Sequence, residues 1–77
     1  MTKTELINSI NEMDRTMMAQ GTKTYLRFKQ MVATRQIKES IGYNKRFLKP
    51  SSLNKVQLER LHLIITDSFN KVMWLGK

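Results

Sequence analysis

Residues 53–75, LNKVQLERLHLIITDSFNKVMWL, decide the fold, because apolar residues recur there at helical spacing and no Gly or Pro interrupts them. At about 100° per residue, one broad face of this predicted helix collects most of the apolar side chains. That face consists of Leu58, Leu61, Ile64, Ile65, Phe69, Val72 and Leu75. Val56, Leu63 and Trp74 project to the opposite side. The pattern therefore predicts a helix, placed at residues 52–74, with one surface in the core and a second contact surface opposite.

A first helix is predicted over residues 3–20. Thr2 and Glu5 have the spacing of a capping box, which satisfies two backbone N–H groups at a helix start. One apolar row steps by four, three and four: Leu6, Ile10, Met13 and Met17. Gly21 is expected to end this helix, because glycine adopts the left-handed C′ conformation most easily.

The helix between these two is predicted over residues 23–41, capped by Thr22 or Thr24 and followed by Gly42. It carries two neighbouring apolar rows. The first row is Tyr25, Phe28 and Val32, and the second is Leu26, Ala33 and Ile37. We expect the second row to pack in the core. Ser51 or Ser52 is expected to cap the last helix.

The predicted fold class is all-α, a single domain over residues 1–77 built as a small three-helix bundle or an open helical arrangement. A chain of 77 residues buries only about 60% of its unfolded surface. It has no Cys for disulfides and no Cys/His set for a structural zinc. The sequence therefore predicts that a homodimer through the last helix, or docking on another protein, completes the core.

No apolar run approaches the roughly 20 residues that span a bilayer, so no membrane span is predicted. The N-terminal residues lack the apolar segment of a secretory signal. An intracellular, cytoplasmic location is the resulting expectation.

The net charge of +8 is concentrated in the middle of the chain. Residues 22–60 contain ten Lys and Arg and two Glu, whereas the remainder has four bases and four acids. Lys23, Arg27, Gln30, Thr34 and Lys38 form one row of the second predicted helix. Cations in such a row can neutralise phosphates and release counterions.

We therefore predict a small basic regulatory or accessory protein that binds nucleic acid. The predicted phosphate-contacting residues are Lys23, Arg27, Lys38, Lys45, Arg46 and Lys49. Four aromatic residues, Tyr25, Phe28, Tyr43 and Phe47, lie among these bases and could stack on unpaired bases. The alternative for Tyr25 and Phe28 is a place in the core.

Residues 34–48, TRQIKESIGYNKRFL, resemble the short helix-turn-helix pattern in their order of apolar residues around Gly42. The resemblance implies that Asn44, Lys45, Arg46 and Lys49 enter a DNA groove. Lys38 stands where a small residue normally lets the two helices approach, and Pro50 shortens the second helix. A helix end followed by a basic loop is the interpretation that we favour.

Catalysis and metal binding are not predicted. His62 is the single His and has no Cys or arranged acids near it in the sequence, and the three Gly lie at helix ends and form no phosphate-cradling loop. We expect no enzyme activity, metal or cofactor.

The second functional hypothesis is an adaptor or inhibitor that docks on another protein through Val56, Leu63 and Trp74. Its basic surface would then steer it toward an acidic protein partner. The composition, rich in Lys and Asn and free of Cys, is of the kind found among phage and plasmid accessory proteins.

Overall fold

The computed structural model describes residues 1–39 and 53–75, and the regular structure in these ranges is helical. The helices are α1 (Lys3–Ala19), α2 (Thr22–Lys38) and α3 (Lys55–Leu75). The predicted all-α class with three helices is confirmed. Among these helices, none combines the length and the apolarity that a membrane crossing requires.

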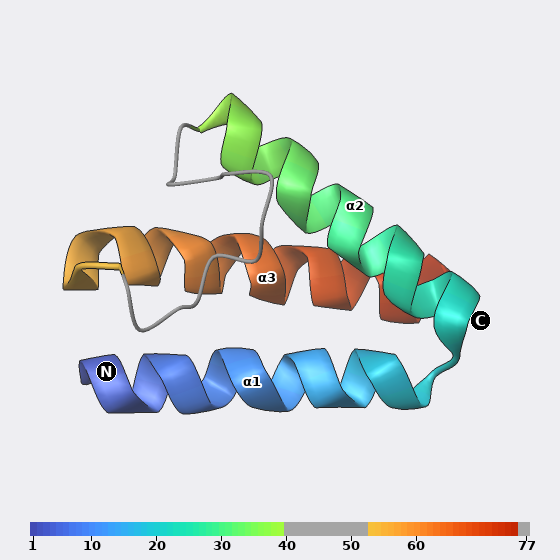
Figure 1. The fold of residues 1–77 in the computed structure, drawn as a ribbon, viewed down its shortest axis with the longest axis horizontal. Coiled ribbons are helices and arrows are strands. Elements are labelled where there is room, and N and C mark those ends of the chain that lie inside the picture. The colour runs from blue at the N-terminus through green and yellow to red at the C-terminus, as the bar shows by residue number, and fades with distance from the viewer. Residues whose placement is uncertain (40–52, 76–77) are drawn as a thin grey trace.

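The helices pack as an up-down-up arrangement (Figure 1). α1 and α3 run side by side in the same direction, and α2 runs back across them at an angle, beginning beside the C-terminal end of α3. Ser9 Oγ lies 2.9 Å from His62 Nε2 and links α1 to α3. Tyr25 donates its hydroxyl to Asp14 Oδ1 at 3.0 Å and links α2 to α1. His62 therefore has a structural role between two helices.

The predicted capping box starts α1. Thr2 Oγ1 accepts the Glu5 N–H at 3.2 Å, and Glu5 Oε1 accepts the Thr2 N–H at 2.9 Å. These hydrogen bonds, first that from the Thr2 backbone and then that with its side chain, lower the pKa of Glu5 because they favour its carboxylate form.

The connection between α1 and α2 consists of Gln20 and Gly21. Gly21 has φ 107° and ψ 161°, which only glycine adopts readily, so the predicted break at this residue is confirmed. The predicted Thr22 and Thr24 caps are wrong. Thr22 already belongs to α2, and Gly21 is the N-cap, whose carbonyl accepts the Tyr25 N–H at 3.0 Å.

Replacing Gly21 by alanine is expected to destabilise the protein by about 1 to 3 kcal/mol. A Cβ at this position meets nothing within 4 Å, so the cost arises in the backbone and not from a clash. Urea unfolding followed by circular dichroism measures the change. The control is Gln20→Ala, at the neighbouring residue with an ordinary φ of −80°, where a loss of similar size would contradict the backbone explanation.

α3 begins at Lys55 and not at residue 52, because Asn54 caps it. Asn54 Oδ1 accepts the Gln57 N–H at 2.8 Å, and Gln57 Oε1 accepts the Asn54 N–H at 3.3 Å. Ser51 and Ser52, which were predicted to cap this helix, lie outside the described residues. At the end of α2, Glu39 is the C-cap, so the helix stops short of the predicted residue 41.

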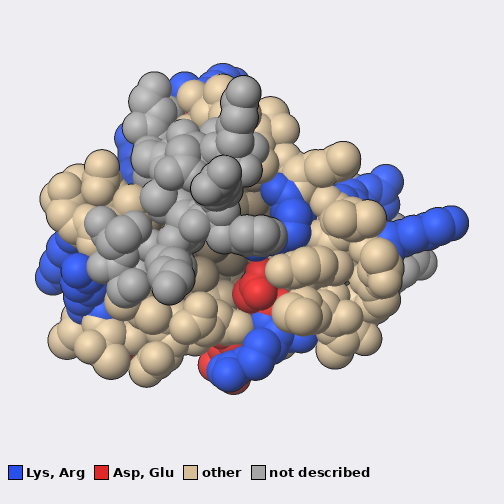
Figure 2. Space-filling view, viewed as in Figure 1, with Lys and Arg blue, Asp and Glu red and all other residues tan. Residues whose placement is uncertain are grey.

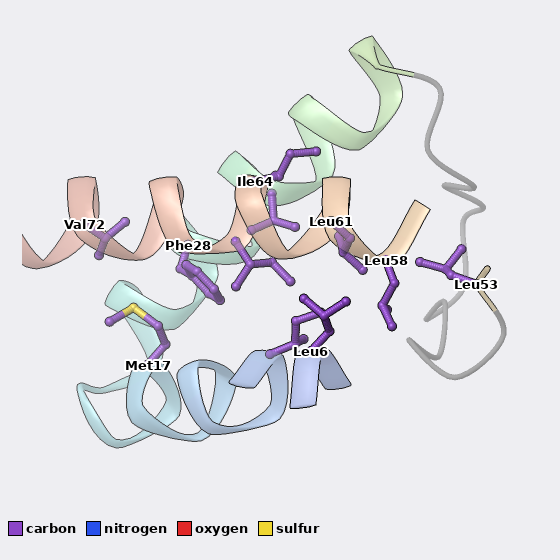
Figure 3. Close-up of a cluster of buried hydrophobic side chains, with 11 residues drawn as sticks. Leu6, Met17, Phe28, Leu53, Leu58, Leu61, Ile64 and Val72 are labelled. Atoms are coloured by element: carbon purple, nitrogen blue, oxygen red, sulfur yellow. The ribbon is translucent and has the colours of Figure 1, made fainter. Parts of the chain in front are cut away.

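The core lies where the three helices meet (Figure 3). Leu6 and Met17 point from α1 toward α3, with Phe28 of α2 between the helices. The buried apolar residues are Leu6, Ile10, Met17, Phe28, Val32, Leu53, Leu58, Leu61, Ile64, Ile65 and Val72. The predicted packing rows of the first and last helices are confirmed, with Met13 and Phe69 half-buried at their margins. Leu75, the last residue of the predicted face, has a side chain outside the described part of the structure.

The expectation that Leu26, Ala33 and Ile37 pack in the core is wrong for Leu26 and Ile37, while Ala33 is half-buried. Leu26 is 56% exposed and Ile37 60% exposed, whereas Phe28 is 1% exposed. A helix turns about 200° over two residues, so burying Phe28 directs Leu26 away from α1 and α3. The other apolar row of α2 therefore supplies the core, and it continues through Val32 to the buried amide of Gln36.

Candidate nucleic-acid interface

Two of the cations of α2 are held in ion pairs. Lys29 Nζ lies 3.5 Å from Asp14 of α1. Arg35 contacts Glu39 at 3.2 Å and Asp67 of α3 at 2.6 Å. Both side chains are half-buried, so they connect α2 to its neighbours and hold its orientation.

The other three cations of α2 are those predicted to contact phosphates. Lys23, Arg27 and Lys38 are exposed, and none of them forms an ion pair with any residue that the structure describes. They share one face of α2. Their charge is therefore directed to solvent, and no described residue compensates it through an ion pair.

The remaining predicted cations, Lys45, Arg46 and Lys49, lie outside the described residues. The same is true of Asn44 and of all but the first six residues of the helix-turn-helix resemblance. Those first six residues form the end of α2 and its C-cap.

Arg27, Gln30 and Thr34 of the basic row of α2 line a shallow, open groove with a volume of about 360 Å³. Lys71 is the lining residue that comes from α3. The groove is lined by Arg27, Gln30, Met31, Thr34, Arg35 and Lys71. Three of these residues are cationic, two are neutral hydrogen-bonding residues, and Met31 contributes apolar surface. This composition suits an anion attached to an apolar or aromatic group.

Lys71 was not predicted as part of this site. In the sequence it belongs to the neutral remainder of the chain, and nothing there shows that it faces α2. Its Nζ lies 3.4 Å from Asp67 Oδ2, the oxygen that also accepts from Arg35 Nη1. Asp67 therefore partly neutralises the α3 side of the groove, and Arg27 carries the uncompensated charge.

On the face shown in Figure 2, the Lys and Arg of the described residues do not form one continuous patch. Figure 2 shows Lys and Arg at several separate places around this view, with Asp and Glu atoms near the lower centre. The candidate interface is therefore defined by the face of α2 that borders the groove and not by the total charge.

Two of the aromatic residues proposed for stacking are not accessible. Phe28 is buried in the core. Tyr25 is half-buried, its hydroxyl is bonded to Asp14, and Lys29 Nζ lies 5.6 Å from its ring centroid. Burial raises the pKa of Tyr25, and the hydrogen bond to Asp14 adds to this effect. The core alternative is confirmed for Phe28, and Tyr43 and Phe47 lie outside the described residues.

The outer face of α3, defined by Val56, Leu63 and Trp74, points to solvent. These residues are 74%, 56% and 77% exposed. The first helix does not cover them, since α1 packs on the side of α3 that carries His62 and Thr66. Along the described chain this face is therefore open to a further molecule.

Comparisons with known proteins give no guide to this site: no protein-family model matches the sequence, and no curated protein or solved structure matches it.

Proposed function

We propose that the protein binds nucleic acid through phosphate contacts of the exposed face of α2. The observation that carries this proposal is the division among the cations of α2. Lys29 and Arg35 are paired with carboxylates, whereas Lys23, Arg27 and Lys38 share a face and pair with none of the described residues. Cations that only stabilise the fold would be expected to have partners within it.

The length of the row supports the same function. Lys23 and Lys38 are fifteen positions apart, so the row extends about 22 Å along the helix. Gln30 and Thr34 lie between the cations and can donate to phosphate oxygens. Several phosphates of one nucleic-acid strand can therefore contact side chains of this one helix.

The test is the salt dependence of binding to a fluorescently labelled oligonucleotide, measured by anisotropy. Each phosphate contact contributes about 0.7 to 0.9 to the slope of log affinity against log salt concentration. Three contacts predict a slope of about −2 to −3, which weakens binding about 20- to 40-fold between about 50 and 200 mM salt. An affinity that is unchanged over this range would contradict the proposal.

A second candidate function is docking on a protein through the outer face of α3. The specific observation is the exposure of Val56, Leu63 and Trp74 along one side of a helix whose opposite side is in the core. The simplest partner is a second copy of the chain, as the small core predicts. Sedimentation equilibrium that finds only monomer at micromolar concentration would remove the homodimer.

A further inference from the structure

We infer that Trp74 and the groove between α2 and α3 form a site for an unpaired nucleobase and its phosphate, so that the preferred ligand is single-stranded nucleic acid. This inference rests on the proposed function and names its substrate class. It begins from the position of Trp74. Trp74 follows Lys71 by three residues, which places it about 4.5 Å further along α3 and about 60° around the helix.

Trp74 does not itself line the groove, but it follows Lys71, which does. Lys71 lines the groove together with Arg27, and α2 begins beside the C-terminal end of α3 (Figure 1). Arg27 lies in the second turn of α2, and Trp74 is the last residue but one of α3. Both residues therefore lie toward the end of the helix pair at which α2 begins and α3 ends.

These two groups match the two parts of an unpaired nucleotide. A base can stack on an aromatic ring without regard to its identity, while a cation holds the phosphate. In a duplex the base faces are occupied by their neighbours, so an indole at a protein surface gains little from them. Gln30 and Thr34 add an amide and a hydroxyl that can bond to the sugar or the base edge.

Trp74 is also the ring that the fold leaves accessible. Among the aromatic residues of the described ranges, Phe28 is buried, Tyr25 and Phe69 are half-buried, and Trp74 is 77% exposed. A large apolar ring at this exposure is stabilised when a ligand covers it. The cations beside it favour a negatively charged ligand over an apolar one.

The test uses the intrinsic fluorescence of Trp74, which is the single tryptophan of the chain. The full chain is titrated with oligo-dT, with oligo-U and with a DNA duplex of the same length, and anisotropy is recorded in parallel. We expect both single strands to quench the emission in a saturable manner. The duplex is expected to bind more weakly and without quenching. The ratio of the affinities for oligo-dT and oligo-U shows whether DNA or RNA is preferred.

The matched variants are Trp74→Ala, Trp74→Phe and Leu63→Ala. Trp74→Ala removes the stacking of one base and should therefore weaken single-strand binding by about 5- to 150-fold. Trp74→Phe keeps an aromatic ring and should lose less. Leu63→Ala removes an exposed apolar residue from the same face of α3 but farther from Arg27. The affinity of this variant for a single strand should therefore equal that of the unaltered chain.

Each other outcome has a defined meaning. If single strands and duplex bind equally well and the emission does not change, the inference is wrong while the proposed function stands. If no nucleic acid changes the anisotropy, both fail. If the emission depends on protein concentration without nucleic acid, a second copy covers Trp74 and the inference is again overturned. Circular dichroism of the three variants checks that each retains its helices.

Discussion

Replacing Phe28 by alanine is expected to destabilise the protein by about 3 to 5 kcal/mol, because the fully buried ring leaves a cavity where the three helices meet. A chain of 77 residues has a total stability of about 4 to 12 kcal/mol. The substitution therefore removes a large part of that stability or all of it. Thermal unfolding by circular dichroism should show a midpoint lower by about 12 °C or more.

The control for this prediction is Leu26→Ala on the same helix. Leu26 is 56% exposed and contributes little to the core, so the expected change is within about 0.5 kcal/mol. The pair of variants also tests which face of α2 is buried. Equal losses from both substitutions would show that α2 is rotated relative to the arrangement described above.

The double charge reversal Arg27→Glu, Lys38→Glu is expected to abolish most nucleic-acid binding. Both side chains are exposed and unpaired with the described residues, so the fold does not depend on their charge. Removal of two phosphate contacts should make the salt slope shallower by about 1.5 and weaken binding at low salt by about tenfold or more. Anisotropy titrations at several salt concentrations measure both effects.

A matched control separates the site from the total charge. Lys3→Glu, Arg15→Glu on α1 changes the net charge by the same four units, also at exposed positions. Equal losses from the two double variants would mean that only the overall charge matters, and the assignment to α2 would be wrong. Because a Glu at position 38 also opposes the helix dipole, the neutral pair Arg27→Gln, Lys38→Gln provides a milder second test.

Much of the fold is predictable from local patterns. Residues 53–75 show one continuous helical periodicity with a single possible core face, and the structure buries that face from Leu58 to Val72, with Phe69 half-buried. The capping box of Thr2 and Glu5 depends on only four residues, so no distant contact decides it. Gly21 is likewise set by its own backbone.

The face of α2 was not predictable in the same way. Its two apolar rows, one with Phe28 and one with Leu26, both have helical spacing, and the choice depends on contacts with other helices. Those contacts include the hydrogen bond from Tyr25 to Asp14 and the ion pair between Arg35 and Asp67. The start of α3 was ambiguous for a related reason, since Ser51, Ser52 and Asn54 are all good capping residues.

The candidate site was half predictable. The basic row of α2 follows from spacing along one helix, and Lys23, Arg27 and Lys38 lie exposed as that spacing implies. The groove depends on which helices are neighbours, so Met31 and Lys71 gave no signal in the sequence. Trp74 was predicted to lie in a protein interface. Its position three residues after Lys71 is plain from the sequence, but the neighbourhood of Lys71 and Arg27 depends on how α2 and α3 pack.

The carboxylate of Asp67 forms ion pairs with both Arg35 and Lys71. It therefore makes the two ends of the groove differ in how far their positive charge is compensated. At Arg35, a phosphate would compete with the Asp67 carboxylate for the guanidinium. At Arg27, no carboxylate of the described residues competes with it. The positive charge of the described groups is therefore less compensated at Arg27 than at Arg35. If a nucleic-acid strand binds along the groove as we propose, its two ends meet unequal surroundings, and we expect one 5′-to-3′ polarity to be preferred over the reverse.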